Sequence, residues 1–170
     1  MSYWTPEPLG AQHIVDDFRC PSEEQTDWLR RYARQSMSMS TTRVFVVTAS
    51  NSDVVVAYYA WGMAQLSTES APLRLEQGAG RYPQPVALLA RLGVDECHER
   101  RGLGAALLCD VLLRFLEVAS EIGCRALLVH AESEEARSFY EHLIPEFETS
   151  PTDTLHLVLL AKDIARSLRQ

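Results

Sequence analysis

The residues whose types and spacing best suit chemistry lie in one stretch, Arg100-Arg101-Gly102-Leu103-Gly104-Ala105. They follow an apolar run and precede a long amphipathic segment, which predicts a strand, a polar turn and a helix. Glycine lacks Cβ and can adopt positive φ, so a ligand can approach the backbone. Because the first N–H groups of a helix have no intrahelical partner, this turn could cradle a pyrophosphate beside its two arginines. An ordinary tight turn is the alternative, since two glycines at this spacing are weak evidence alone.

The cysteines and histidines offer no second reactive centre. Cys97-His98 sits beside the glycine turn and would supply a thiol and a base, but adjacent residues on a turn point apart, so we expect no nucleophilic pair. The other cysteines, Cys20, Cys109 and Cys124, are far apart and form no Cys-x-x-Cys motif. The spacing therefore predicts reduced thiols, with no disulfide framework, no zinc site and no metal cofactor.

The elements around the turn form a βαβ unit. An apolar strand spans Val86 to Val94, interrupted only by Arg91, and a helix with a single polar stripe spans Leu103 to Ile122. Gly123 ends the helix, and a second buried strand covers Arg125 to His130. A strand–helix–strand crossover implies that these two strands run parallel.

Further elements flank this unit. Ser22 can cap a helix over Glu23 to Arg34, which would bring Trp28 and Tyr32 together at i, i+4. The other expected elements are a short strand at Ala11–Val15, a connection or second helix at Gln35–Thr42, a hairpin of Arg43–Ala49 and Val54–Trp61, a loop over Ser67–Pro85, a final strand at Leu155–Leu160 and a terminal helix at Asp163–Leu168.

A helix that begins after Ser133 carries Phe139 and Tyr140 on its apolar face, and Pro145 ends it. By helical spacing alone, Tyr140 is a core residue that packs beside Phe139. Four residues are candidates for acid–base chemistry by location: Asp95, Glu96, His98 and His130. Their spacing favours none of them, so the residues alone identify no general base.

Composition places the chain among folded globular proteins. Its 170 residues are 46% hydrophobic and 23% charged, enough for one well-packed domain, which we expect to span residues 1–170. No apolar run approaches the roughly 20 residues that cross a bilayer. The first residues, Met1 to Pro6, lack a signal pattern. We therefore expect a cytoplasmic protein with no membrane partner.

The net charge of −7 argues against general nucleic-acid binding, which depends on clustered lysine and arginine. The distribution is uneven, however, because residues 28–52 contain no Asp or Glu but include Arg30, Arg31, Arg34 and Arg43. Such a run usually marks a solvated helix face. The alternative is an acidic protein with one basic face.

The order of the elements resembles the GNAT acyltransferases. The turn motif of that family, Gln/Arg-x-x-Gly-x-Gly/Ala, is matched at Gly102 and Gly104, while Glu99 occupies the first position. This departure matters little because the turn binds through backbone N–H groups, although a carboxylate must point away from a pyrophosphate. The resemblance implies an α/β GNAT fold with a mixed central sheet, a βαβ core that binds acetyl-CoA, and helices on both faces of the sheet.

Several blocks are similar to one branch of the family, the tRNA-acetylating toxins of type II toxin–antitoxin modules (TacT-type). These blocks are Pro85–Asp95, Arg125–Ala131, Glu135-Ala136-x-x-Phe139-Tyr140, Ser150–Asp153 and, less specifically, Phe18-x-Cys20 with Asp27–Leu29. The chain departs from the branch after Tyr140, where Ile144–Phe147 replaces the usual Gly-Phe, so the geometry there stays open.

The resemblance also assigns roles to residues. Tyr140 would protonate the departing CoA thiolate, and backbone N–H groups near Leu92 to Val94 would polarise the thioester carbonyl. The expected acetyl-CoA-binding residues are Leu92, Gly93, Val94, Arg100, Arg101, Gly102, Leu103, Gly104, Ala105, Ser133 and Phe139. For a bound tRNA we expect a basic groove of Arg30, Arg31, Arg34, Arg74 and Arg81.

The absence of an evident base favours one class of acceptor. An α-amine has a reference pKa of about 7.7–8.0, so roughly a fifth to a third of it is neutral near pH 7.4. A lysine ammonium, with a pKa of about 10.4, would cost about 3–4 kcal/mol more to deprotonate. A weak need for a base therefore suits an α-amino acceptor, and the resemblance implies that this acceptor is the aminoacyl group of charged tRNA, whose acetylation would halt translation. A GNAT that acts on a small amine or a protein lysine, and a CoA-binding regulatory module without turnover, remain open alternatives.

The same resemblance implies partners. We expect an antitoxin with a ribbon-helix-helix DNA-binding part, contact with operator DNA only through that antitoxin, and a homodimer of the chain. The sequence leaves open which aminoacyl-tRNA is acetylated.

Overall fold

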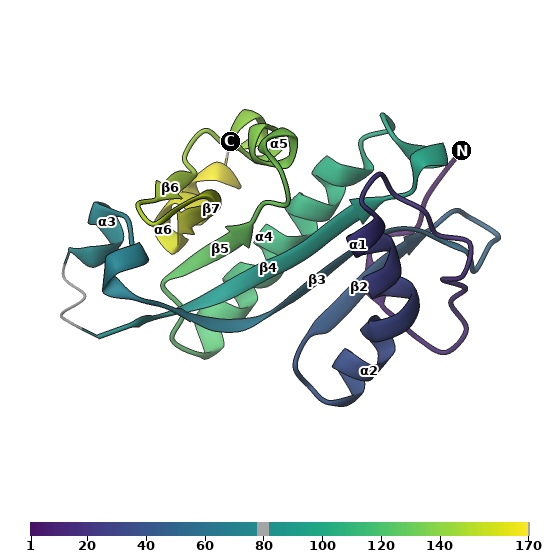
Figure 1. Cartoon of the computed structure of the whole chain (residues 1–170), viewed down its shortest axis with the longest axis horizontal. Helices are drawn as coiled ribbons and strands as arrows, with labels where there is room; N and C mark the ends of the chain where they lie inside the picture. Colours follow the sequence, from purple (N-terminus) through teal and green to yellow (C-terminus); the bar gives the residue numbers. More distant parts are fainter. Residues whose placement is uncertain (78–81, 170) are drawn as a thin grey trace. The chain divides into compact units, whose positions relative to one another are not determined.

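The computed structural model describes residues 1–77 and 82–169, and within them seven strands form one mixed sheet in the order β1-β2-β3-β4-β5-β7-β6 (Figure 1). The strands are β1 (Glu7–Pro8), β2 (Arg43–Thr48), β3 (Val55–Leu66), β4 (Gln84–Val94), β5 (Ala126–His130), β6 (Glu148–Ser150) and β7 (Asp153–Leu160). The helices are α1 (Glu23–Asp27), α2 (Ala33–Ser38), α3 (Leu73–Glu76), α4 (Leu103–Glu121), α5 (Glu134–Leu143) and α6 (Ala161–Ser167). The expected α/β fold with a mixed sheet and a βαβ core is confirmed.

The chain divides into two compact units. The first comprises Met1–Gly62 and Arg91–Asp110, and the second comprises Met63–Ala90 and Val111–Gln170. β3, β4 and α4 each contribute residues to both units. The expectation of one domain over residues 1–170 stays a prediction.

In the first unit, one helical segment runs from α1 to α2 through a π-helical turn at Trp28–Tyr32. Ser22 caps it as predicted, because its side-chain oxygen accepts a hydrogen bond from a first-turn N–H at 3.2 Å. Inside the π turn, the Ala33 N–H donates to the Trp28 carbonyl, five residues earlier. The expected end at Arg34 is wrong, because the helix continues to Ser38.

The core of the first unit forms around Tyr58, which is fully buried on β3. The Trp28 ring stacks on it at 6.2 Å between centroids, and the Phe18 ring meets it edge-on at 5.4 Å. Trp28 therefore packs on Tyr58 and not on Tyr32, which is 54% exposed. The wider π turn changes which residues share a face, so the i, i+4 pairing expected for a regular α-helix does not hold.

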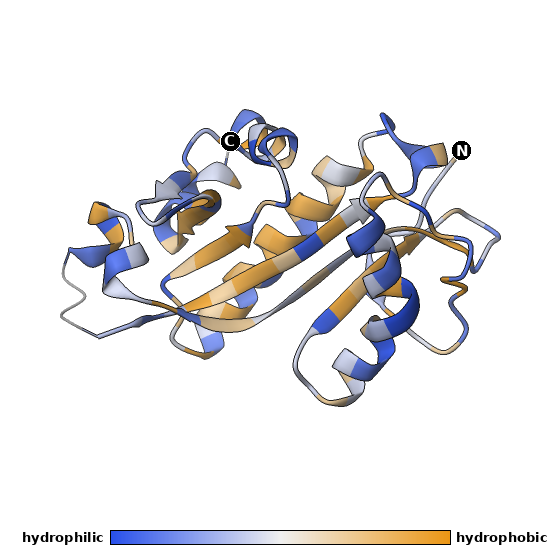
Figure 2. Cartoon of the chain, viewed as in Figure 1, coloured by the Kyte–Doolittle hydropathy of each residue, from blue (hydrophilic) through white to orange (hydrophobic). Residues whose placement is uncertain are grey.

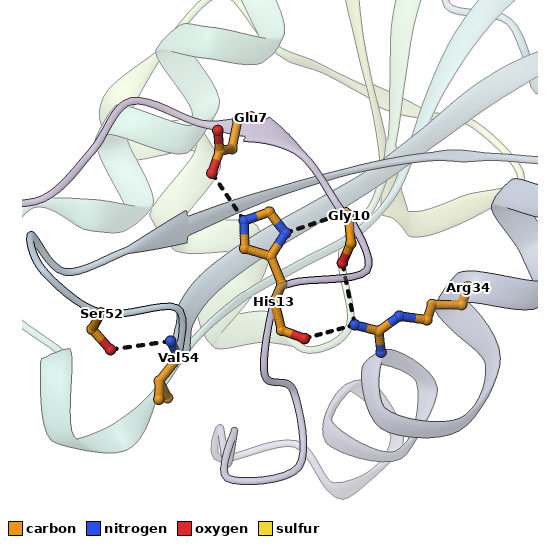
Figure 3. Close-up of polar contacts among 6 residues, drawn as sticks. All are labelled: Glu7, Gly10, His13, Arg34, Ser52 and Val54. Carbon is orange, nitrogen blue, oxygen red and sulfur yellow. Dashed lines mark hydrogen bonds and ion pairs between the residues drawn. The ribbon is translucent and has the colours of Figure 1, made fainter.

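The hairpin of β2 and β3 is confirmed, with an antiparallel register that runs from Arg43↔Trp61 to Thr48↔Val55. At its turn Asn51 adopts φ 68°, and the Ser52 hydroxyl accepts a hydrogen bond from the Val54 N–H at 3.1 Å (Figure 3). Asn tolerates the left-handed region and Ser can hydrogen-bond to a backbone N–H two residues on, which explains why these residue types form the turn.

The strand predicted at Ala11–Val15 is wrong. The His13 N–H donates to the Gly10 carbonyl at 3.2 Å, and the Gly10 N–H donates back to His13 Nδ1 at 2.8 Å (Figure 3). This local pairing closes a turn where the sequence pattern predicts extended backbone. Only Ile14 in this stretch makes a strand-like bridge, to Val54.

In the second unit, β4 and β5 run parallel, as predicted, and pair from Val86↔Ala126 to Leu89↔Val129. β4 continues past this paired stretch to Val94. Both strands are hydrophobic along most of their length (Figure 2). The core of this unit includes Leu66, Leu75, Val86, Ala126, Leu128, Val158 and Leu160.

The loop expected over Ser67–Pro85 is shorter than predicted. A 3-10 turn at Thr68–Ser70 and α3 occupy part of it, and β4 already begins at Gln84. Leu75 anchors α3 because its side chain is fully buried. β6 was not predicted, since three polar or acidic residues show no strand pattern, and its partner β7 begins earlier than expected, at Asp153.

Candidate functional site

The glycine turn joins β4 to α4 in the first unit. Its backbone enters the left-handed region at Arg100 (φ 60°) and at Gly102 (φ 81°). A Cβ at Gly102 would meet no heavy atom within 4 Å, so the backbone angle, and not lack of space, favours glycine. Gly104 does not use this freedom, because it already lies in the first turn of α4. The Ala106 N–H donates to the Gly102 carbonyl at 3.0 Å, which leaves the preceding helical N–H groups without an intrahelical acceptor.

Arg100 is a feature that the sequence pattern did not reveal. A residue with a Cβ in the left-handed region costs of order 1–3 kcal/mol, and such positions cluster at functional sites. Arg100, Arg101 and Gly102 are all exposed. The turn therefore presents free N–H groups, the positive end of α4 and two guanidinium groups to solvent, which is the chemistry of an anion site.

Asp95 holds the strand end in front of this turn. Its carboxylate accepts hydrogen bonds from the Arg19 N–H at 3.0 Å and from the Cys97 N–H at 2.9 Å. Its own N–H donates to the Val56 carbonyl at 2.8 Å. With 9% exposure and both oxygens engaged, Asp95 has a positioning role, although by location it was a candidate base. The signal in the sequence was an acidic residue directly after a buried strand, where a capping carboxylate is common.

The strand residues Leu92 to Val94 lie in the first unit next to the turn. Gly93 is buried, and a Cβ there would approach Gln25 Oε1 at 3.1 Å and Tyr58 Cε1 at 3.3 Å. A Cβ at this position would therefore be crowded, because side chains of α1 and β3 pack closely against the β4 backbone. The expected role of nearby N–H groups in polarising a carbonyl stays a prediction.

Tyr140 lies on α5 in the second unit and is 5% exposed. Its ring makes edge contacts with Phe139, at 5.2 Å between centroids, and with Phe147, at 6.0 Å. Burial, followed by the Glu132 carboxylate, raises the pKa of the Tyr140 phenol above its ordinary value. The phenol is therefore held in its protonated form, which suits a proton donor.

The segment after Tyr140 departs from the resemblance, yet it keeps an aromatic partner for this ring. Ile144 and Phe147 are both buried, and Phe147 supplies the second edge contact. At the other end of α5, Ser133 is the N-cap and accepts a hydrogen bond from the Ala136 N–H at 3.2 Å. The hydroxyl of Ser133 thus orients the helix that carries Tyr140.

His130 is the acid–base candidate of the second unit. Its ring stacks on that of His156 at 3.8 Å between centroids. Burial, and then the neighbouring His156, lower the pKa of His130, while Asp153 opposes the shift. His130 is therefore neutral near pH 7 and able to accept a proton.

The arginines expected to bind RNA fall in different surroundings. In the first unit Arg31 is exposed, and Arg30 has a buried Nε without a hydrogen-bond partner. Arg30 also lines a cleft of about 520 Å³ together with Arg19, Cys20, Thr26, Asp27 and Glu96. Arg34 Nη2 donates to the carbonyl oxygens of His13 at 2.7 Å and Gly10 at 3.3 Å (Figure 3). These acceptors are neutral, so they do not compensate the positive charge of Arg34.

Arg74 differs because two carboxylates hold it within the second unit. Its Nη1 lies 2.9 Å from Asp163 Oδ2 and 3.0 Å from Glu148 Oε1. The Asp163 side chain is only 1% exposed, so Arg74 neutralises a buried charge. Arg81, the other arginine expected from the long loop, lies outside the described residues.

Two general features of the described residues bear on the site. Across residues 1–77 and 82–169, no three His, Cys, Asp or Glu side chains are grouped so that they could hold a metal ion. Within the same residues, none of the helices combines the length and the apolar character that crossing a membrane requires.

Comparison with known proteins identifies relatives along almost the whole chain. The model of the acetyltransferase (GNAT) family matches residues 10–143. A tRNA-acetylating toxin of Mycobacterium tuberculosis is 40% identical over 166 residues, covering 98% of this chain and 96% of the relative.

Two solved structures share the fold. One is the AtaT toxin complexed with acetyl-methionyl-tRNAfMet, with a TM-score of 0.87, 21% identity and coverage of 98% of this chain and 99% of that chain. The other is a Tyr-to-Phe mutant of AtaT bound to the C-terminus of the antitoxin AtaR and acetyl-CoA, with a TM-score of 0.82, 21% identity and full coverage of both chains. With the family model matched over residues 10–143, and a 40% identical relative aligned along nearly its entire length, this chain belongs to the acetyltransferase (GNAT) family.

Proposed function

We propose that this chain is the toxin of a type II toxin–antitoxin pair, and that it transfers acetyl from acetyl-CoA to the α-amino group of an aminoacyl-tRNA. The observation that carries the proposal is the 40% identity to a tRNA-acetylating toxin over 98% of this chain. The acetylated amino acid can no longer accept a growing peptide, so translation stops.

In the proposed reaction the glycine turn binds acetyl-CoA and Tyr140 donates a proton. The N–H groups at the start of α4, with Arg100 and Arg101, bind the pyrophosphate of acetyl-CoA. The amine attacks the thioester carbonyl carbon, a C–N bond forms, and the C–S bond breaks. The phenol of Tyr140 gives its proton to the departing thiolate, and the proton released by the amine restores the phenol. The raised pKa of Tyr140 supports this role because the donor is protonated at every physiological pH.

An α-amine is the acceptor that this machinery suits best. Asp95 is not free for the task, since both oxygens of its carboxylate accept backbone N–H groups. A neutral His130 is one candidate for a proton acceptor, beside Glu96 and His98. An α-amine with a pKa of about 7.7–8.0 needs little help from a base, whereas lysine needs about 3–4 kcal/mol more.

The helical segment of the first unit offers the RNA-binding charges. Arg30, Arg31 and Arg34 carry no ion pair with a described carboxylate, in contrast to Arg74. We expect Arg31→Gln to weaken aminoacyl-tRNA binding and to lower the slope of log K against log salt by roughly 0.7–0.9, with kcat unchanged. Arg169→Gln, which removes the same charge from an exposed position of the second unit, is the control. An equal effect of the two variants would remove Arg31 from the site.

The proposed partners follow from the toxin assignment. They are an antitoxin with a ribbon-helix-helix part that occludes the enzyme and contacts operator DNA, and a second copy of the chain in a homodimer. Sedimentation of the purified chain, alone and with the neighbouring gene product, tests both: a mass of one chain, unaltered by that product, contradicts them.

The function is tested by release of free thiol from acetyl-CoA with four candidate acceptors offered in turn: aminoacylated tRNA, deacylated tRNA, a lysine peptide and a small amine. We expect release with aminoacylated tRNA and none with deacylated tRNA. Release with a lysine peptide or a small amine, but not with charged tRNA, would assign the enzyme to another branch of the family.

A further inference from the structure

The N-terminal residues make a direct connection to the glycine turn inside the first unit. The Arg101 Nη1 group lies 3.2 Å from Tyr3 Oη, and Tyr3 Oη lies 2.9 Å from His98 Nδ1. The Tyr3 and His98 rings also meet edge-on, at 5.7 Å between centroids and 75° between planes. Three residues from two segments, the N-terminal segment and the connection between β4 and α4, thus form one hydrogen-bonded chain.

The direction of donation along this hydrogen-bonded chain follows from which groups can donate and which can accept. A guanidinium only donates, so the Tyr3 oxygen accepts from Arg101. The phenol O–H is then free to donate, and His98 Nδ1 accepts it when the ring carries its proton on Nε2. Because each bond polarises the next, a phenol that accepts from a cation is a stronger donor. In this arrangement both hydrogen bonds have a donor and an acceptor.

Tyr3 and His98 are both fixed by backbone contacts. Tyr3 bridges Ala49, and the neighbouring Trp4 N–H donates to the Thr48 carbonyl at 3.0 Å, which ties the segment to β2. On the other side, the His98 N–H donates to the Asp95 carbonyl at 2.8 Å. The exposed Arg101 is therefore held by Tyr3, which is itself held by His98 and by its bridge to Ala49.

We propose that Tyr3 and His98 are positioning residues, which restrain the Arg101 guanidinium beside the glycine turn and so raise the affinity of the turn for the phosphates of acetyl-CoA. The inference rests on the proposed function, in that acetyl-CoA is the ligand of the turn. A free arginine side chain samples many rotamers and loses that freedom when it binds a phosphate. A side chain held in advance loses less, and the difference appears as affinity.

Tyr3→Phe removes the hydroxyl and leaves the ring contact with His98. We expect the Kd and KM for acetyl-CoA to rise roughly two- to tenfold, the range of one net hydrogen bond, while kcat at saturating acetyl-CoA stays unchanged. Ser2→Ala is the matched control, because Ser2 belongs to the same segment and its hydroxyl bonds to Ser50 at 2.8 Å, away from the turn. This control should leave both constants unchanged.

A second pair of variants tests the hydrogen-bonded chain at His98. His98→Leu removes the acceptor and should act like Tyr3→Phe, whereas His98→Asn keeps an acceptor near the Nδ1 position and should restore most of the affinity. In an Arg101→Gln background, Tyr3→Phe should have little further effect, because the group that it positions is gone. Additive losses in that double variant, or equal Kd values for Tyr3→Phe and Ser2→Ala, would overturn the inference.

Calorimetric titration of acetyl-CoA into the intact protein, without any acceptor, separates this inference from the proposed function. If the wild-type chain binds no acetyl-CoA, the assignment of the turn fails and the inference fails with it. If the wild type binds and the Tyr3 and His98 variants bind equally well, only the inference fails. Thermal melting of each variant confirms that the comparison is made between folded proteins.

Discussion

Gly102→Ala isolates the contribution of backbone conformation to the glycine turn. Gly102 has φ 81°, and a Cβ built there would meet no atom within 4 Å, so alanine introduces strain without a clash. The left-handed region costs an L residue about 1–2 kcal/mol. Alanine also restricts the unfolded chain, which returns about 0.4–1 kcal/mol to the folded state. The net expectation is a loss of stability of roughly 1 kcal/mol.

Gly123→Ala supplies the matched control for this variant. A Cβ at Gly123 also meets no atom within 4 Å, but its φ lies outside the left-handed region. Only the unfolded-state contribution applies, so this variant should gain about 0.4–1 kcal/mol. The two alanine variants should therefore differ by about 1–2 kcal/mol in urea unfolding followed by circular dichroism.

Acetyl-CoA binding by the same two proteins completes the test. Gly102→Ala should weaken binding, because strain at the turn displaces the N–H groups that face the pyrophosphate, and Gly123→Ala should not. Equal stability of the two variants would refute the reasoning about φ. Unchanged acetyl-CoA affinity in Gly102→Ala would refute the role of the turn.

Three further outcomes follow from packing and titration. Gly93→Ala should lower the urea midpoint by an amount equivalent to about 1–3 kcal/mol, because its Cβ would lie 3.1 Å from Gln25 Oε1 and 3.3 Å from Tyr58 Cε1. An unchanged urea midpoint would contradict this and would mean that α1 moves to make room for the Cβ. The native pKa of Tyr140 is raised, so its stabilising contribution should be lost as pH rises above the unfolded value of about 10, and urea midpoints between pH 9 and 11 should fall less in Tyr140→Phe. The native pKa of His130 is lowered, so stability should be lost as pH falls below about 6.5, and His130→Gln should flatten the stability profile between pH 7 and 5; a parallel profile would contradict this.

The strongly periodic parts of the chain were predictable. The run from Val86, the turn at Gly102 and the helix that follows have patterns typical of a βαβ unit, and β4 and β5 are parallel as that pattern requires. Here local propensity and burial on both faces point to the same structure. Family resemblance then supplied the role of Tyr140, which helical spacing alone assigns to the core.

Other parts could not be read from local patterns. The π turn at Trp28–Tyr32 has no recognisable motif, and it moves Trp28 onto Tyr58. His13 closes a turn through its side chain where alternation suggested a strand. These outcomes depend on tertiary contacts and on side chains that compete with the backbone for hydrogen bonds.

In the site, too, some features could be predicted from the sequence and others could not. Gly102 was recognised as a residue for positive φ, but Arg100 was not, because an arginine has no preference for that region. Asp95 was placed near the turn, yet its two backbone partners come from segments distant in sequence or from its own strand end. From charge alone, Arg74 was grouped with Arg30, Arg31 and Arg34. The structure shows that Arg74 instead forms an ion pair with the buried Asp163.

The central claim is that this chain acetylates aminoacyl-tRNA with Tyr140 as proton donor. The most direct measurement is incubation of the purified protein with acetyl-CoA and a pool of charged tRNA, followed by mass analysis of the amino acids recovered from the tRNA ends. The account predicts an N-acetylated amino acid with the wild type, and a rate lower by roughly 10²–10⁴ with Tyr140→Phe. An equal rate with Tyr140→Phe, or no acetylated amino acid on any tRNA, would contradict it.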